Sequence, residues 1–331
     1  MERVKASCFL MGKHSLKRRN PDSFLNLTVR DGLATSAVAK LLGDPFGALW
    51  IGFGVTEDVL RIDPPGSNGL VYRANPIGLP KILCRSIAHG RDGAVWISGL
   101  NNYWSAQANP VSGIYRIEGT NYTRVHPDDA VLCAGPDGTI WAVAKNQGFG
   151  RFDGTNFIQV AGWSEFASLV SWDAWKLGIC ASRDGRVWIP GGNHLICYDG
   201  RSFSKLTPDQ ALHIENVCEA QDGAIWLSTP RGMHRYDGKR FEAFTTSDGL
   251  ANDSVFSCLV AKDGTTWGGT FGGASHYDGI TWANLDTRDG LPAPPVNSIA
   301  EGADGTIWFG TLGGVCRYQP NRIQPTARIL S

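Results

Sequence analysis

Short apolar segments alternate with glycine-rich polar turns along most of the chain. One unit recurs: an apolar stretch, an Asp-Gly pair, a segment with a tryptophan, a second Gly-rich turn, and a segment that ends in an aromatic residue. Residues 304–311, Asp-Gly-Thr-Ile-Trp-Phe-Gly-Thr, show the centre of the unit most clearly. The Asp-Gly pair suits a tight turn between antiparallel strands, because glycine accepts positive φ without steric cost. Each unit therefore predicts a small antiparallel sheet.

The tryptophan of this unit recurs seven times, at positions 50, 96, 141, 188, 226, 267 and 308. The spacing of 38 to 47 residues indicates a solenoid, an array or a propeller. Each unit reads as four strands of about five residues. Seven such units predict an all-β fold, a seven-bladed β-propeller with four antiparallel strands per blade. In this fold the repeat tryptophans are core residues, and the alternative is that they form a ligand stack.

The two ends of the chain predict how the ring closes. Phe241 and Trp282 each precede an Asp-Gly-Leu triplet by seven residues, and Phe24 has the same relation to residues 31–33. Residues 23–28 therefore resemble a fourth strand with no blade before it, while the last unit has three strands ending at Tyr318. We expect the amino-terminal strand to complete the last blade, which removes an open sheet edge.

These boundaries divide the chain into a propeller at 23–319, a disordered leader at 1–22 and a tail at 320–331. The leader is basic, and its apolar patch at 6–11 is shorter than a secretory signal, which argues weakly against export of the chain as written. No apolar run approaches the roughly 20 residues that cross a bilayer.

The composition mainly excludes classes of partner and site. Lys plus Arg and Asp plus Glu both number 31, so no net field favours nucleic acid or an anionic membrane. The eight cysteines lack CxxC spacing, and no cofactor or metal site is predicted. Cys133, Cys180 and Cys218 each lie eight residues before a repeat tryptophan. Equivalent positions in different blades are a blade's width apart, which disfavours disulfides between them and predicts buried free thiols.

The repeat resembles that of the two-component regulator propeller. The pattern is Asp-Gly-Leu, Asn/Ser-x-Val, Asp-Gly-x-Ile-Trp-Phe-Gly-Thr-x-x-Gly-Gly and Arg-Tyr, and residues 289–318 and 248–278 match it best. The resemblance extends over about 24–319, with the first four repeats more diverged. The Gly-His and Trp-Asp pairs of the WD repeat are missing from the sequence.

This resemblance implies an extracytoplasmic sensor. Such propellers sit in front of a small β-sandwich, a membrane helix and a histidine kinase, and many of them detect glycans. The tail at 320–331 is similar to the start of such a sandwich. The resemblance thus implies a periplasmic ligand-binding input module, not an enzyme, with a histidine kinase as its output partner. The sequence departs from the family in having one propeller where glycan sensors often have two, and in having no kinase segment.

Two long segments are the candidate ligand site, because function usually lies on variable loops held by a rigid scaffold. Residues 101–113 and 161–176 both belong to the face that carries the blade-to-blade connections. We expect their aromatic residues to form a platform on which an oligosaccharide stacks: Tyr103, Trp104, Trp163, Trp172 and Trp175. The alternative is that these side chains pack on one another and only stabilise the loops.

Two further readings stay open. The sequence lacks HExxH and GxSxG motifs. A propeller-type lyase would instead need a general base and a group that stabilises an enolate. The candidates on the connections are His126 and His213, with Asp128, Asp129, Asp209 and Glu215 nearby in sequence. A scaffold for protein partners is the third reading.

Overall fold

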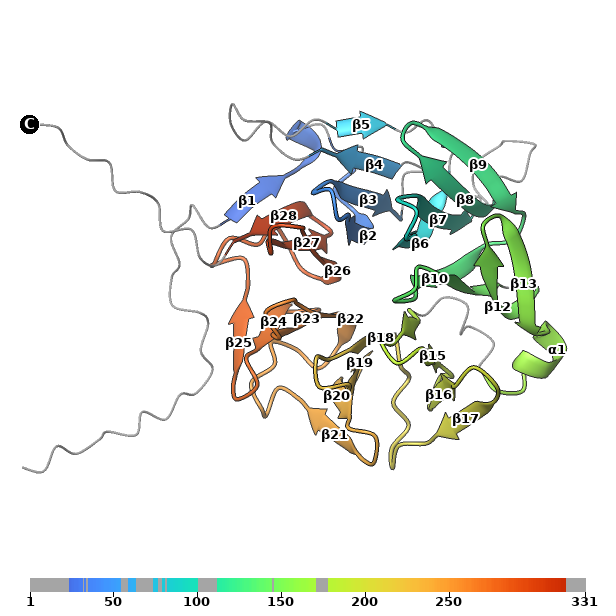
Figure 1. The fold of residues 1–331 in the computed structure, drawn as a ribbon. Helices are drawn as coiled ribbons and strands as arrows, with labels where there is room; N and C mark the ends of the chain where they lie inside the picture. The colour runs from blue at the N-terminus through green and yellow to red at the C-terminus, as the bar shows by residue number, and fades with distance from the viewer. Residues whose placement is uncertain are drawn as a thin grey trace, which may run out of the picture.

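The ring of seven sheets predicted from the tryptophan spacing is present. The computed structural model describes residues 24–31, 33, 35–54, 59–63, 74–76, 79–80, 82–100, 112–144, 146–170 and 178–319. Within these residues, seven four-stranded antiparallel sheets follow one another around a central channel, in chain order (Figure 1). The fold is all-β, as predicted. The proposed leader at 1–22 and tail at 320–331 lie outside the described residues.

Each blade runs from an inner strand at the channel to an outer strand at the rim. The first three blades comprise β2 (Val38–Gly43), β3 (Leu49–Phe53), β4 (Val59–Ile62) and β5 (Ala74–Pro76); β6 (Leu83–His89), β7 (Val95–Leu100), β8 (Gly113–Glu118) and β9 (Asn121–His126); and β10 (Ala130–Ala134), β11 (Ile140–Ala144), β12 (Gly148–Asp153) and β13 (Asn156–Ala161). A short helix, α1 (Trp163–Phe166), follows blade 3.

The next three blades have the same plan. They comprise β14 (Cys180–Ala181), β15 (Val187–Pro190), β16 (Leu195–Tyr198) and β17 (Phe203–Leu206); β18 (Asn216–Glu219), β19 (Ile225–Thr229), β20 (Gly232–Tyr236) and β21 (Phe241–Phe244); and β22 (Val255–Val260), β23 (Thr266–Thr270), β24 (Gly273–Tyr277) and β25 (Trp282–Leu285). Blade 7 contains β26 (Val296–Glu301), β27 (Ile307–Thr311) and β28 (Gly314–Tyr318).

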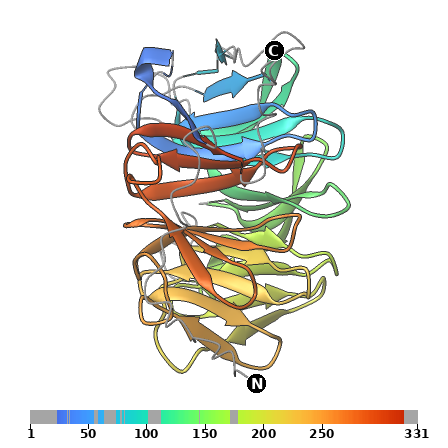
Figure 2. The same cartoon turned by 90° about the vertical axis from the view of Figure 1, so that its left-hand side faces the viewer.

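The amino-terminal strand completes blade 7, which confirms the predicted closure. Strand β1 (Phe24–Leu27) pairs antiparallel with β28, and Phe24 lies opposite Tyr318 (Figures 1 and 2). Asn26 Nδ2 donates to Gly290 O at 2.9 Å, just as Asn284 Nδ2 donates to Gly249 O at 2.9 Å in blade 6. Strand β1 therefore makes the contacts of a fourth strand, although no covalent turn joins it to β28. The 3₁₀ turn η2 (Val29–Asp31) then leads into blade 1.

The Asp-Gly pairs form the turns between the first and second strands. Gly223 has φ of 83° and Gly305 has φ of 77°, a region that glycine enters without strain. The preceding aspartate fixes the turn from its side chain: Asp222 Oδ1 accepts a hydrogen bond from Ala224 N at 3.1 Å. These turns and those between the third and fourth strands lie at one end of each blade. We call this end the Asp-Gly face and the opposite end, with the blade-to-blade connections, the connection face.

The repeat tryptophans join neighbouring blades. Each of five packs on the aromatic residue near the end of the third strand of the next blade, with ring centroids 4.9–6.1 Å apart: Trp96 on Phe152, Trp141 on Tyr198, Trp188 on Tyr236, Trp226 on Tyr277 and Trp267 on Tyr318. Six of the seven tryptophans are at most 6% exposed, and Trp141 is partly buried. The prediction that these tryptophans are core residues is confirmed.

Candidate functional site

The first candidate site is the central channel. A cavity of about 150 Å³ lies between the inner strands and receives residues from all seven blades. Its polar and charged lining consists of Lys40, Arg85, Ser86, Asn216, Ser257, Asn297 and Ser298.

The polar lining follows from one position of the repeat. Ten residues before the tryptophan, three blades carry serine. Ser86 Oγ accepts a hydrogen bond from Leu132 N at 3.0 Å, and Ser298 Oγ accepts one from Leu41 N at 3.0 Å. Two of the three serines thus bond to the inner strand of the next blade, whereas the buried Ser257 Oγ has no hydrogen-bond partner among the described residues.

Lys40 occupies this same position in blade 1, and it departs from the pattern. Burial lowers the pKa of the Lys40 ammonium, while the charges of Cys84 and Glu215 act in the opposite direction. Glu215 belongs to the connection that leads into blade 5, so its influence on Lys40 reaches across the channel. The side chain of Lys40 is surrounded by protein yet keeps some surface in the lumen. A cation held this way suits a ligand that supplies oxygen acceptors.

Further charged groups lie on or next to the segments that lead into the inner strands of blades 3 and 5. Arg85 Nε lies 3.7 Å from Asp129 Oδ2, and Asp129 is only 3% exposed. His213 Nε2 lies 3.6 Å from Glu215 Oε1, and His213 has a positive φ of 50°. Glu215, Asp129 and His213 were sequence candidates, and the fold places Glu215 and His213 side by side.

The other lyase candidates belong to local turns. His126 Nδ1 accepts a hydrogen bond from Asp128 N at 3.1 Å, and its ring lies 5.5 Å from that of Phe157. Asp128 Oδ1 accepts from Asn146 Nδ2 at 3.0 Å. Asp209 is exposed on the connection before blade 5. These contacts fix the turn after β9 and do not bring His126 into the pair formed by His213 and Glu215.

Of the predicted aromatic platform, Trp163 is the one member within the described residues; Tyr103, Trp104, Trp172 and Trp175 lie outside them. Trp163 opens α1, is partly buried and packs against the core between blades 3 and 4. Its ring centroid lies 6.4 Å from that of Phe166, which is fully buried. The start of this connection is therefore anchored on the propeller, and Trp163 presents part of its indole outward.

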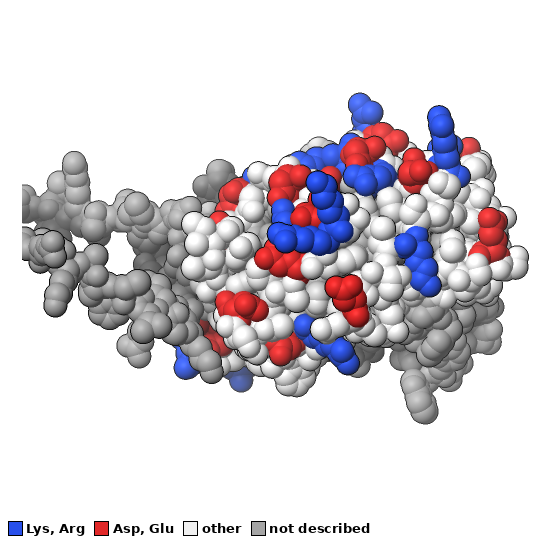
Figure 3. Space-filling model, turned by 90° about the horizontal axis from the view of Figure 1, so that it is seen from below, with Lys and Arg blue, Asp and Glu red and all other residues white. Residues whose placement is uncertain are grey.

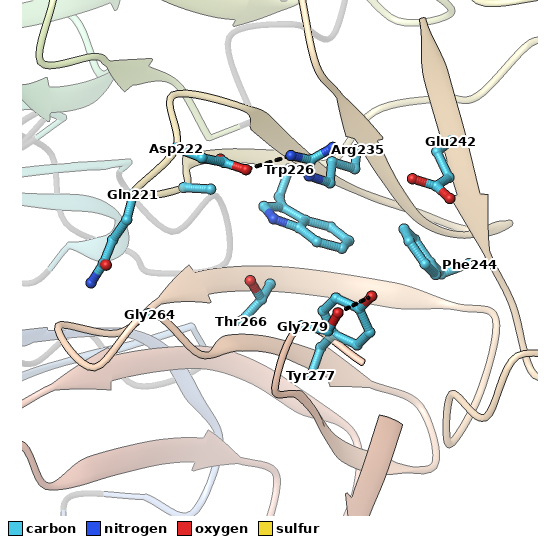
Figure 4. Close-up of a pocket in the computed structure, with 11 residues that line it drawn as sticks. Gln221, Asp222, Trp226, Arg235, Glu242, Phe244, Gly264, Thr266, Tyr277 and Gly279 are labelled. Atoms are coloured by element: carbon cyan, nitrogen blue, oxygen red, sulfur yellow. Dashed lines mark hydrogen bonds and ion pairs between the residues drawn. The ribbon is translucent and has the colours of Figure 1, made fainter. Parts of the chain in front are cut away.

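A second cavity was not anticipated from the sequence. It measures about 420 Å³ and lies between blades 5 and 6 at the Asp-Gly face (Figure 4). Trp226, Phe244 and Tyr277 form aromatic walls, and Arg235 Nη2 lies 2.5 Å from Asp222 Oδ2 at the rim.

The position six residues before the tryptophan lies beside the indole of the same blade. In blades 1 and 4 that position holds a polar residue that accepts from the indole: Asp44 Oδ2 from Trp50 Nε1 and Ser182 Oγ from Trp188 Nε1, both at 3.1 Å. Blade 5 has Ala220 instead, a small residue that offers the Trp226 indole no side-chain acceptor. Blades 2, 3, 6 and 7 also have glycine or alanine at this position, so the sequence gives no signal that singles out the cavity of blade 5.

The surface charge is mixed. On the side seen in Figure 3, acidic and basic residues lie beside one another and neither forms a continuous patch. No three His, Cys, Asp or Glu side chains of the described residues are grouped to hold a metal ion. Within the same residues, no helix has the length and apolar character that a membrane span needs.

The fold defines this chain as a seven-bladed β-propeller, and its repeat is that of the two-component regulator propeller. The family model described as "Two component regulator propeller" matches residues 290–313, which confirms the resemblance seen in the sequence. No curated protein matches the sequence.

Two groups occur among the solved structures of similar fold. One is the extracellular domain assigned to a hybrid two component system of B. thetaiotaomicron, with TM-score 0.65 and 18% identity over 90% of this chain. The present chain spans 41% of that protein's length. The other group contains a streptogramin B lyase, with TM-score 0.69 and 14% identity over 90% of this chain and 98% of the lyase. Virginiamycin B lyase of Staphylococcus aureus has a TM-score of 0.67 and 16% identity, over 89% of this chain and 97% of the lyase. At these identities the likeness shows the shared fold.

Proposed function

We propose that this propeller is a ligand-binding sensor or input module and that its ligand is a carbohydrate. One observation carries the proposal: a two-component regulator propeller repeat builds a ring whose channel is lined by all seven blades, five of which contribute polar or charged side chains. Hydrogen-bond donors and acceptors in a rigid concave site are the means by which proteins orient small polar ligands.

In this proposal two sets of residues share the ligand. Lys40 and Arg85 supply charged hydrogen-bonding groups in the channel, and Glu215 acts on the charge of Lys40. Tyr103, Trp104, Trp172 and Trp175, with the outward part of Trp163, supply apolar surfaces for the faces of sugar rings. The first set fixes orientation and the second set adds contact area. A histidine kinase is the proposed output partner.

The test is a titration of the purified chain with a panel of neutral and acidic oligosaccharides, followed by calorimetry. The expected result is saturable binding that Lys40→Met weakens at least tenfold. Lys239→Met is the matched control, because Lys239 is an exposed lysine in a turn of the Asp-Gly face. If both variants bind like the native chain, the ligand does not use the channel. Capture of a protein with no response to sugars would favour the scaffold reading.

A lyase is the second candidate, and the pairing of His213 with Glu215 at 3.6 Å favours it. A carboxylate beside an imidazole can orient the ring, and an oriented imidazole is what a general base requires. The test is product analysis after incubation with uronic-acid polysaccharides and with cyclic depsipeptides. Turnover that is lost in His213→Ala and kept in His126→Ala would identify this enzyme, because His126 is tied into its own turn. Absence of any product would leave the sensor role.

A further inference from the structure

The inner strands of neighbouring blades meet by a rule that holds at every interface of the ring. The residue eight positions before the tryptophan of one blade packs in the same apolar cluster as the residue nine positions before the tryptophan of the next blade. The seven pairs are Leu42 with Ile87, Ala88 with Leu132, Cys133 with Ile179, Cys180 with Val217, Cys218 with Cys258, Leu259 with Ile299, and Ala300 with Leu41.

Side-chain alternation explains the rule. Successive residues of a strand point to opposite faces of the sheet, so adjacent positions on an inner strand face the two neighbouring blades. Cys133, Cys180 and Cys218 are equivalent and all face forward, which is why none of these three is expected to cross-link with another. Cys258 lies one position earlier in its repeat and faces backward. The interface between blades 5 and 6 is thus the one where this rule sets two cysteines face to face.

Independent contacts place the two thiols together. Cys258 Sγ lies 3.8 Å from Trp226 O, and Trp226 is the cross-strand partner of Cys218. Cys218 and Cys258 also belong to the same buried cluster, together with Trp226. Cys258 is 8% exposed and Cys218 is partly exposed. Both cysteines are free in the structure.

We propose that Cys218 and Cys258 form a reversible disulfide that cross-links blades 5 and 6. The oxidant is a small disulfide such as oxidised glutathione. The thiolate of Cys218, the more exposed of the two, attacks one glutathione sulfur and releases the first glutathione thiolate. The Cys258 thiolate then attacks Cys218 Sγ in the mixed disulfide and releases the second. The two cysteines together lose two protons and two electrons, and one glutathione disulfide becomes two glutathione thiols.

The surroundings set the conditions for this reaction. The neighbouring Cys258 side chain and burial both hold the pKa of the Cys218 thiol well above its usual value. Only the thiolate attacks a disulfide, so exchange is slow near neutral pH and accelerates as the pH rises. The bond, once formed, fixes the inner edge of the interface that also contains the Trp226 cavity.

The experiment uses the full chain, incubated with oxidised glutathione at mildly alkaline pH and then alkylated in denaturant. Before oxidation all eight cysteines are alkylated. Afterwards we expect six alkylated cysteines, a mass lower by two hydrogens before alkylation, and one linked peptide pair containing residues 218 and 258. Dithiothreitol restores all eight. Eight alkylated cysteines after oxidation, glutathione adducts alone, or linkage of other cysteines would each overturn the proposal.

Matched variants separate the pair from the other thiols. Cys258→Ala removes the linked peptide, whereas Cys180→Ala keeps it, because Cys180 faces the apolar Val217. Val217→Cys adds a partner for Cys180 and should create a second linked peptide, with residues 180 and 217. If Val217→Cys folds and this second link does not form, the facing rule that supports the proposal is wrong.

Discussion

The closure of the ring can be tested by two phenylalanines that differ in one respect. Phe24 packs on Tyr318 at 4.9 Å, and Phe241 packs on Tyr236 at 4.7 Å. Both are partly buried and both lie directly opposite their tyrosine in the ladder between third and fourth strands. Phe241 sits on a strand that a short turn ties to its neighbour, whereas β1 is joined to β28 by hydrogen bonds and side-chain packing alone.

The expected loss of global stability is similar for the two substitutions. Complete burial of a phenylalanine makes its replacement by alanine cost about 3–5 kcal/mol, and an aromatic pair contributes about 0.5–1.5 kcal/mol beyond its area. Partial burial reduces the sum, so Phe24→Ala and Phe241→Ala should each lower the free energy of unfolding by about 2 kcal/mol. Denaturation with urea measures both values.

The local response should differ. Strand β1 has four residues, and loss of Phe24 removes the side chain that holds its first pair. In Phe24→Ala we expect the amides of β28 that bond to β1 to exchange hydrogen by local opening, well below the global unfolding free energy. In Phe241→Ala the amides of β20 should keep exchange close to the global value. Equal loss of protection at β28 and β20 would refute the reasoning, because the covalent turn would then make no difference.

Three further predictions concern buried polar groups and the connection tryptophan. Burial lowers the pKa of His234 to about 4, so between that value and 6.5 the unfolded chain binds a proton that the folded chain does not. The free energy of unfolding should therefore fall by up to about 3 kcal/mol as the pH drops through this window. In urea titrations, His234→Gln should abolish that part of the pH dependence. Lys40→Met replaces a cation in a confined channel with an apolar chain of similar length and should raise the unfolding free energy by on the order of 1 kcal/mol in the same assay. Trp163→Ala should lower the free energy of unfolding by about 1–2 kcal/mol, and Trp308→Ala by about 3–5 kcal/mol, because only Trp308 is almost fully buried. Equal losses would mean that Trp163 is a core residue with no surface left for a ligand.

The fold could be predicted because its determinants are local and repeated. An Asp-Gly turn before a tryptophan strand specifies a hairpin, and six such copies with a degenerate first copy, Phe46-Gly47, specify a ring. The closure could be predicted as well, because Phe24 keeps the seven-residue spacing to Asp-Gly-Leu that Phe241 and Trp282 show. Both inferences need only the order of residues along the chain.

The channel and the cavity depend on which face of a strand each residue occupies. Lys40 lies in a mostly apolar stretch and is conspicuous only when the repeats are aligned on their tryptophans, where it stands in place of serine. The Trp226 cavity has no such signal, because five of the seven blades have glycine or alanine at the position of Ala220. The sequence prediction placed the ligand site on the long connections instead. In the structure, Trp163 at the start of one of these connections is partly buried.

The same alignment explains why cysteine spacing alone gave an incomplete answer. Equivalence within the repeat correctly argues against cross-links among Cys133, Cys180 and Cys218, because these side chains point in the same direction around the ring. A shift of one residue reverses that direction, since the side-chain period of a strand is two. Cys258 has this shift, and it belongs to the blade that Cys218 faces. A disulfide there would close a loop of about 40 residues, for which chain entropy predicts about 4 kcal/mol of stabilisation. In a closed ring such a bond acts on one interface of seven, so its effect should appear first as slower local opening of blades 5 and 6.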